Sequence, residues 1–193
     1  MRSTGPDAGS ARGGVPHGRG IRYTAPVDFS TFADLDLVLI CGLPGSGKSH
    51  FSERFFKDQG RKRVSRKEIR RLLYEMTNFG AAWSETRYAE VDEHLVKHVE
   101  RKIIEQLLQN KQKVLVDNTC VTAAAREVYV AVATQMHKSA GVVFLNTPAK
   151  ACLERNRKRE DPVPETVISN LSAAIELPTR REGFREMLVV KEY

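Results

Sequence analysis

The most constraining feature of this chain is the segment 42–49, which reads Gly-Leu-Pro-Gly-Ser-Gly-Lys-Ser and satisfies the complete pattern G-x-x-x-x-G-K-S/T. A short apolar run precedes it at residues 37–41, and residues 48–57 follow it at helical period. In a strand, loop and helix of this kind, successive N–H groups and the helix N-terminus point at a bound anion. The segment therefore predicts a phosphate loop at the end of a buried strand, and a site for a nucleoside triphosphate.

The pattern also assigns roles within the loop. Lys48 is expected to reach the β- and γ-phosphates of ATP, and the Ser49 hydroxyl is expected to bind Mg²⁺. A glycine turn that only joins a strand to a helix is the alternative, and the Lys-Ser pair between suitable flanks argues against it. The rest of the loop is expected to wrap the phosphates, namely Gly42, Leu43, Pro44, Gly45, Ser46 and Gly47.

Strand-like and helix-like patterns alternate from residue 37 onward, which indicates an α/β fold with a parallel sheet of about five strands flanked by helices. The long helix predicted after the second strand is expected to start at Ser84 and to stop at Asn110. Strands are predicted at residues 37–41, 63–65, 114–117, 142–146 and 187–190. Helices are predicted at residues 48–57, 67–77, 84–110, 122–138, 148–157 and 164–176.

Length and charge bound the remaining possibilities. The 193 residues suffice for one catalytic domain, which the pattern places at residues 37–193. Residues 1–36, rich in Gly, Pro and Arg at their start, are expected to be a disordered basic arm or a remnant of an expression vector. The formal charge of +7 favours a polyanionic partner, and composition alone does not separate nucleic acid from nucleotide.

Cysteine usage and hydropathy bear on location. Cys41, Cys120 and Cys152 are scattered without C-x-x-C spacing, so neither a disulfide framework nor a zinc site is expected. No apolar run approaches the length of a membrane span, and a secretory signal pattern is lacking. We expect an intracellular protein, in the cytoplasm or nucleus, that neither associates with a membrane nor needs an obligate protein partner.

An acid follows the third predicted strand. Asp117 ends the apolar run 114–116, which is where P-loop enzymes hold the Mg²⁺ shell with a carboxylate. An Asx-turn into the next helix is the alternative interpretation. Asn118 and Thr119 come next, at the strand end where α/β sheets present ligand groups.

A guanidinium-rich segment, residues 155–159, ends a predicted helix and precedes a stretch with two prolines that cannot continue it. Such a segment is typical of a lid that brings Arg155 and Arg159 over a triphosphate. The alternative is a solvated set of cations that favours the macrodipole at a helix C-terminus.

A dense basic run at residues 61–71 surrounds the second predicted strand. It could be a solvated face, but its place beside the phosphate loop makes it a candidate for gripping a polyanionic acceptor. Trp83 and Tyr88 could stack on bases or serve as packing residues. His94 and His98 are four residues apart without the further ligands that a metal site needs.

At these residues the chain resembles the polynucleotide 5′-hydroxyl kinase family, represented by the phage enzyme and by the kinase domain of the animal polynucleotide kinase-phosphatase. The resemblance runs from Leu37 to the C-terminus. It implies an adenylate-kinase-like P-loop fold and transfer of the ATP γ-phosphate to a 5′-hydroxyl of DNA or RNA, with Mg²⁺ as cofactor. The motifs that carry it are the phosphate loop and the segments 65–70, 116–119, 155–159 and 178–184, together with the helix that holds Arg126.

The resemblance also implies roles for single residues. Lys48, Asp117, Arg155 and Arg159 would be catalytic, and Arg66, Lys67, Arg70, Thr119 and Arg126 would contact the acceptor. One departure matters, because Lys67 stands where the family has the acid that deprotonates the attacking hydroxyl, and an ammonium cannot accept that proton. Either Glu68 is the base instead, the register differs there, or the acceptor chemistry has changed or been lost.

Three functions follow for testing. The first is an ATP-dependent kinase of a polynucleotide 5′-hydroxyl, supported by the ordered motifs and the basic charge. The second is a P-loop kinase of a small metabolite or nucleoside. The third is a degenerate module that binds ATP and nucleic acid without turnover, for which Lys67 is the support.

Overall fold

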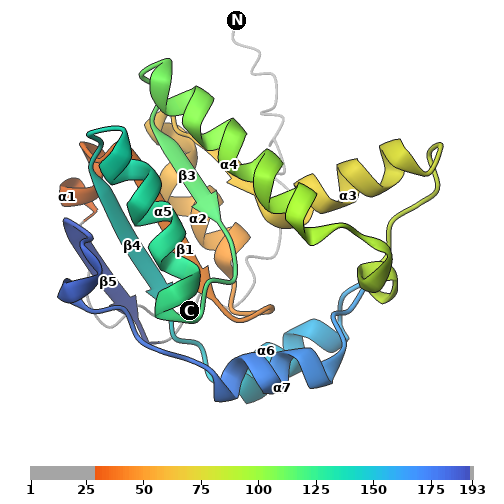
Figure 1. The fold of residues 1–193 in the computed structure, drawn as a ribbon. Helices are drawn as coiled ribbons and strands as arrows, with labels where there is room; N and C mark the ends of the chain where they lie inside the picture. Colours follow the sequence, from red (N-terminus) through yellow and green to blue (C-terminus); the bar gives the residue numbers. More distant parts are fainter. Residues whose placement is uncertain (1–28, 192–193) are drawn as a thin grey trace, which may run out of the picture.

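The computed structural model describes residues 29–191. Five parallel strands form one sheet in the order β2-β3-β1-β4-β5, flanked by helices on both faces (Figure 1). The α/β class and the parallel sheet predicted from the sequence are confirmed. The strands are β1 (Leu37–Gly42), β2 (Lys62–Ser65), β3 (Val114–Asp117), β4 (Ala140–Leu145) and β5 (Glu186–Val190). The helices are α1 (Ser30–Ala33), α2 (Lys48–Phe56), α3 (Arg66–Thr77), α4 (Glu93–Gln109), α5 (Ala123–Gln135), α6 (Ala149–Arg157) and α7 (Glu165–Ala173), with 3-10 turns η1 (Lys57–Gln59), η2 (Glu85–Glu90) and η3 (Arg180–Glu182).

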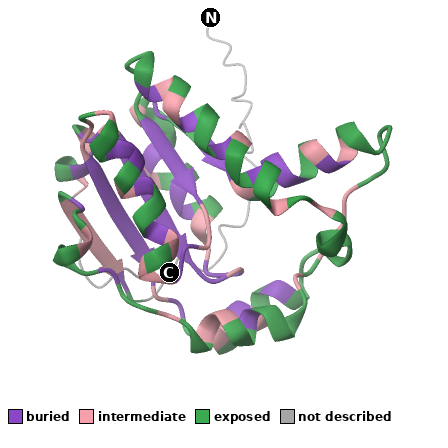
Figure 2. Ribbon diagram, in the orientation of Figure 1, coloured by how far each residue is buried: buried purple, intermediate pink, exposed green. Residues whose placement is uncertain are grey.

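The central strands are apolar along their whole length because they are covered on both sides. Every residue of β1, β3 and β4 is buried, and these strands form the continuous interior of the molecule (Figure 2). One face packs on α4 and α5 through residues such as Ile104 and Val132, and the other packs on α2 through Phe51 and Phe56. This double burial explains why the strands read as unbroken hydrophobic runs rather than as alternating patterns. Among residues 29–191, no helix has the length and apolar character needed to cross a membrane.

The prediction of one continuous helix at residues 84–110 is wrong, because the structure divides this segment into η2 and α4. Val91 has an extended backbone, and the Asp92 carboxylate accepts hydrogen bonds from the N–H groups of His94 and Leu95 at 2.9 and 3.1 Å. A side chain that satisfies these two N–H groups begins a new helix at this position. The division creates a separate segment, residues 78–92, which we call the strap.

The folded core begins before residue 37. Phe32 and Leu35 are buried and pack with Phe51 of α2, so residues 29–36 belong to the domain rather than to an arm. Arg61, the first residue of the basic run, is also buried and donates to the carbonyl oxygens of Phe32 and Leu35. The remainder of the predicted arm, residues 1–28, lies outside the described residues.

Arg126 requires a correction, because it is fully buried rather than facing an acceptor. Its Nε and Nη2 donate to the two carboxylate oxygens of Glu182 at 2.7 and 2.8 Å. Its Nη1 donates to the carbonyl oxygens of Cys120 and Glu176 at 3.3 and 2.8 Å. The residue therefore ties the segment that leads into β5 to the end of β3, and four of its five N–H donors are used inside the protein, where a substrate phosphate does not reach.

We predict that Arg126→Ala destabilises the fold by about 3–5 kcal/mol, because it leaves the Glu182 carboxylate without its buried partner. Arg180→Ala, in η3 two residues before Glu182, is the matched control. About 0.5 kcal/mol or less is expected there, because Arg180 is exposed. Urea unfolding followed by circular dichroism measures both free energies of unfolding. Equal midpoints for the two variants would contradict the assigned role.

The same pair predicts a pH dependence. Burial alone would raise the pKa of Glu182, but the hydrogen bonds from Arg126 and from the Thr179 N–H lower it below its ordinary value. A carboxyl with a lowered pKa stabilises the fold above the pKa of its unfolded form, and this contribution disappears as the pH falls through the folded pKa. The stability difference between wild type and Arg126→Ala should therefore shrink in acid.

Candidate functional site

The phosphate loop follows β1 directly and its backbone has the turn that the glycine pattern predicts. Gly45 and Gly47 have φ values of 84° and 97°, in the left-handed region that favours glycine. A side chain at Gly45 would also meet the carbonyl oxygen of Cys152 at 2.4 Å, so the loop lies directly against α6. Glycine is therefore required at this position both for the backbone conformation and for the approach of the helix.

Lys48 begins α2 and folds back over the loop. Its ammonium donates to the carbonyl oxygens of Gly42 and Leu43 at 3.0 and 2.8 Å. Burial lowers the pKa of Lys48, and the charge of Arg159 adds to this effect while that of Asp117 opposes it. The ammonium is thus held at the mouth of the loop by two neutral acceptors, which a phosphate oxygen could replace.

The side chains of Ser49 and Asp117 meet across β1 and β3. The Ser49 hydroxyl donates to Oδ2 of Asp117 at 2.9 Å, although 68 residues separate them in sequence. The register explains the meeting, since Asp117 pairs with Ile40 of β1, just before the loop starts. The predicted pair of Mg²⁺ ligands therefore lies together, as the carboxyl ends of neighbouring parallel strands require.

Arg63 of β2 also belongs to this site, whereas the sequence placed it only in the basic run at residues 61–71. Its Nη2 and Nε donate to Oδ2 of Asp117 at 2.8 and 3.2 Å, and its Nη1 donates to Glu68 at 2.6 Å. Arg63 thus joins the acid behind the phosphate loop to the acid at the start of α3. No spacing rule connects these three positions, because their meeting depends on β2 being the neighbour of β3.

The predicted lid arginines are carried by α6 and the turn after it. Nη1 of Arg155 lies 3.5 Å from the carbonyl oxygen of Gly45, so this residue already reaches the phosphate loop. Arg159 is exposed, and its charge contributes to the lowered pKa of Lys48. Thr147, just before α6, donates to the Ser46 carbonyl at 3.1 Å and holds the other side of the loop.

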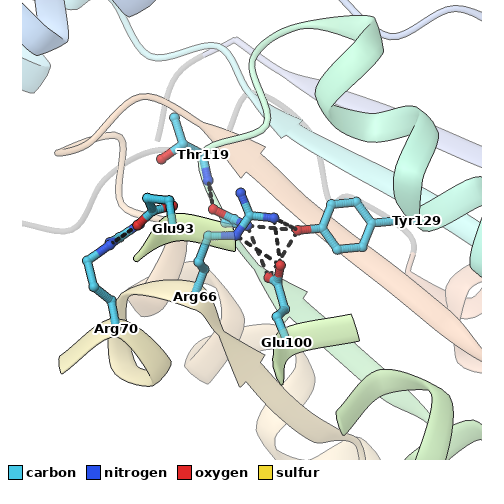
Figure 3. A network of polar contacts seen from close by, with 7 residues as sticks. Arg66, Arg70, Glu93, Glu100, Thr119 and Tyr129 are labelled. Atoms are coloured by element: carbon cyan, nitrogen blue, oxygen red, sulfur yellow. Dashed lines mark hydrogen bonds and ion pairs between the residues drawn. The ribbon is translucent and has the colours of Figure 1, made fainter. Parts of the chain in front are cut away.

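Arg66 is occupied inside the protein rather than facing an acceptor. Its guanidinium donates to Oε2 of Glu100 at 2.6 and 2.9 Å and to the Tyr129 hydroxyl at 2.9 Å (Figure 3). Tyr129 donates to Glu100 and accepts from the Asn118 amide at 2.8 Å. This network joins α3, α4, α5 and the residue that follows β3.

The network also reaches the phosphate loop. The Asn118 side chain accepts from the Thr119 N–H at 2.8 Å, and the Thr119 carbonyl accepts from the Gly42 N–H at 2.9 Å. Burial raises the pKa of Tyr129, so its hydroxyl keeps its proton for Glu100. Arg66 and Thr119 were both predicted to contact the acceptor, and the bonds described here hold them to other parts of the protein instead.

The other cations at the start of α3 are paired as well. Lys67 lies 2.9 Å from a carboxylate oxygen of Glu85 in the strap. Arg70 is nearly buried, forms an ion pair with Glu93, and has the Tyr88 ring 4.7 Å from its guanidinium carbon. Five of the seven cations in residues 61–71 therefore face a carboxylate, and a polyanion would have to compete with these carboxylates for them.

The strap carries the two aromatic residues that could have stacked on bases. The Trp83 ring packs edge-on against Tyr74 of α3 with centroids 5.3 Å apart, which favours the packing interpretation. Tyr88 remains about half exposed, with one face over Arg70. Within residues 29–191 no cluster of three or more His, Cys, Asp or Glu residues is arranged to hold a metal ion, and this includes the neighbourhood of His94 and His98.

Comparison with known proteins places this site in a family. The family model described as an AAA domain matches residues 37–178. A curated relative, L-seryl-tRNA(Sec) kinase from Methanococcus maripaludis, is 26% identical over 142 residues, which are 74% of this chain and 53% of that protein. The chain therefore spans about half the length of the curated relative that it matches.

Solved structures share the fold at low sequence identity. Kti12 of Chaetomium thermophilum, in complex with ADP-AlF3, superposes with a TM-score of 0.56 at 18% identity, covering 80% of this chain and 88% of that one. A gluconokinase from Sinorhizobium meliloti gives a TM-score of 0.52 at 17% identity over 79% of this chain and 80% of that one. Because the family model covers most of its length, the chain belongs to the AAA domain family, and it has the fold of a P-loop kinase.

Proposed function

We propose that this protein is an Mg²⁺- and ATP-dependent phosphotransferase that moves the γ-phosphate to a hydroxyl group. The single observation that carries the proposal is the contact between Ser49 and Asp117, 2.9 Å apart beside the ammonium of Lys48. A glycine loop used only as a turn would need neither this carboxylate nor this lysine. The belonging of the chain to the AAA domain family supports the same assignment.

The donor set of this contact suits Mg²⁺. A hydroxyl and a carboxylate are hard oxygen ligands, and Mg²⁺ is commonly held by one or two such groups together with water and phosphate oxygens. All three hydrogen bonds that Asp117 accepts from Ser49 and Arg63 go to Oδ2. When bound, the ion would neutralise charge on the β- and γ-phosphates.

The chain's own residues would supply position and charge. Lys48 would exchange its two carbonyl acceptors for phosphate oxygens, and Arg155 and Arg159 would approach from α6. Phosphoryl transfer depends mainly on such positioning and charge stabilisation, so the demand on a general base is modest. This is why a displaced base at the start of α3 is compatible with turnover.

For the acceptor, we propose a hydroxyl carried by a nucleic acid, with the 5′-hydroxyl of DNA or RNA as the first choice. The resemblance to polynucleotide 5′-hydroxyl kinases and the charge of +7 support this choice. The relative named as a kinase of L-seryl-tRNA(Sec) supports a substrate that contains RNA. Lys67, Arg70 and Thr119 remain our candidates for the acceptor side, and the two cations would require release from their present carboxylate partners. Arg66 would act there as a positioning residue, through its bonds to Glu100 and Tyr129.

A P-loop kinase of a small metabolite or nucleoside is the second candidate. The observation that favours it is the neutralised basic run, in which the cations from Arg63 to Arg71 each face a carboxylate. A small acceptor does not need free phosphate-binding cations there. A module that binds without turnover would instead show nucleotide binding and no product.

Removal of the loop lysine is the first test. Lys48→Ala should keep the fold and lower ATP turnover by about 100- to 1000-fold or more, because one preorganised charge at the transferring group is lost. Lys57→Ala, at the exposed end of α2, is the matched control and should be neutral. Turnover near wild type in Lys48→Ala, measured by release or transfer of labelled γ-phosphate, would show that the loop is not the donor site.

The acceptor class is tested by salt dependence. If residues 61–71 contact phosphates of a single strand, the logarithm of the binding constant should fall with the logarithm of salt by about 0.7 per contact. The measurement is fluorescence anisotropy of a labelled 5′-hydroxyl oligonucleotide between low and moderate salt. A flat response, with a metabolite labelled instead of the oligonucleotide, would favour the second candidate.

The general base is tested by two substitutions. Glu68 is linked to Asp117 through Arg63, which donates to both carboxylates. Lys67 instead forms an ion pair with Glu85 in the strap. We therefore expect Glu68→Gln to lower acceptor phosphorylation by about 100- to 10,000-fold, the usual range for a general base. Lys67→Gln should have a smaller effect, and the reverse order would assign the decisive position to Lys67.

A further inference from the structure

An aspartate in the loop that follows the predicted lid arginines joins this loop to the strap. The Asp161 carboxylate, in the loop between α6 and α7, accepts from the Glu85 N–H at 3.1 and 3.0 Å and from the Ser84 hydroxyl at 3.1 Å. The two segments are 76 or more residues apart in sequence, and Figure 1 shows the α6–α7 loop reaching η2. Asp161 therefore caps the first turn of η2 from outside its own segment.

Glu85 continues this connection toward α3. Its backbone is bound by Asp161, while its side chain, 8% exposed, forms the 2.9 Å ion pair with Lys67. One residue thus links the lid loop on one side to the first turn of α3 on the other. Lys67 follows Arg66, the residue through which α3 is fastened to Glu100 of α4 and Tyr129 of α5.

The loop that carries Asp161 is also held to α6 by hydrogen bonds. Asn156 of α6 is buried, donates to the Val163 carbonyl at 2.7 Å and accepts from the Val163 N–H at 3.1 Å. Asp161 is held inside this closed loop, and Arg155, the residue before Asn156, reaches Gly45 of the phosphate loop. A shift of α6 toward bound phosphates must therefore be transmitted to Asp161.

We propose that Asp161, Glu85 and Lys67 form a clasp of positioning residues that couples the nucleotide lid to the acceptor side. Movement of Arg155 and Arg159 toward a nucleotide displaces the strap through Asp161, and Glu85 carries this displacement to Lys67 at the start of α3. The coupling rests on the proposed function, because it requires that the loop binds a nucleotide. It makes the acceptor side respond to nucleotide before any chemistry occurs.

Trp83, the single tryptophan of the chain, reports on the strap because it lies two residues before Glu85 and packs on Tyr74. The probe is ADP with Mg²⁺, titrated while tryptophan fluorescence is recorded and, in parallel, by calorimetry. In wild type, fluorescence should change with the same midpoint as the calorimetric curve. In Asp161→Ala this change should be lost, while the calorimetric affinity falls by about 10-fold or less, within the usual range of coupling between sites.

The matched control is Glu160→Ala, which removes a neighbouring exposed carboxylate and should leave both signals as in wild type. Hydrogen exchange without nucleotide tests the clasp itself. The Glu85 amide should exchange at least about 10-fold faster in Asp161→Ala than in Glu160→Ala, since it loses its acceptor.

The outcomes separate two failures. A fluorescence change that persists in Asp161→Ala, or is missing in wild type although calorimetry shows ADP binding, would overturn the coupling and leave the proposed function standing. The absence of any calorimetric ADP binding would reject the proposed function, and the coupling with it. Unchanged exchange of the Glu85 amide in Asp161→Ala would overturn the clasp as a structural connection.

Discussion

The rest of the site depends on the carboxylate of Asp117. It ends β3 beside the start of the phosphate loop, and it accepts from the Ser49 hydroxyl and from the Arg63 guanidinium through the same oxygen. A nearly buried carboxylate needs such donors, because an unpaired charge at this depth would be costly. Meeting that need joins the start of α2, β2 and the end of β3, where a nucleotide and its metal ion would bind.

The net charge does not show which cations are available to bind a ligand, because many of them form ion pairs. The net +7 suggested a surface ready for polyanions, but the basic residues nearest the phosphate loop are matched by Glu68, Glu85, Glu93 and Glu100. When a paired cation binds an incoming phosphate, the free energy gained is only the difference between its interaction with the phosphate and its interaction with the carboxylate that it leaves. Recognition of a polyanion here would therefore involve exchange of partners, and exchange is a means of coupling acceptor binding to movement of the strap.

Rigid and adjustable parts are separated along α3. Its first residue, Arg66, enters the buried network with Glu100 and Tyr129, where removal of one member leaves others unsatisfied (Figure 3). The next residue, Lys67, is half exposed and holds the strap by one ion pair. Adjacent residues thus have different roles, because the first fixes the start of α3 to α4 and α5 and the second contacts the strap.

The sequence by itself determined the class of fold and the pattern of the phosphate loop, and it assigned Ser49 and Asp117 to one expected Mg²⁺ site. These follow from local patterns, since periodicity shows buried strands and parallel strand ends meet at one edge. It also predicted a lid at residues 155–159. It did not predict the strap, which fell within one predicted helix because the cap formed by Asp92 is a weaker signal than helical periodicity. Sequence had no means of assigning partners to charges.

Only the tertiary structure decided which cations are free. Arg126 was expected to contact the acceptor and is instead buried against Glu182. Arg63 was expected only to help grip a polyanionic acceptor with the rest of residues 61–71, and it contacts two acids of the site instead. Long flexible side chains reach across several ångströms, so their partners depend on strand order and on helix placement rather than on neighbours in the chain. Local residue types fix where a phosphate can bind, whereas the pairing of distant charges fixes what remains available to bind it.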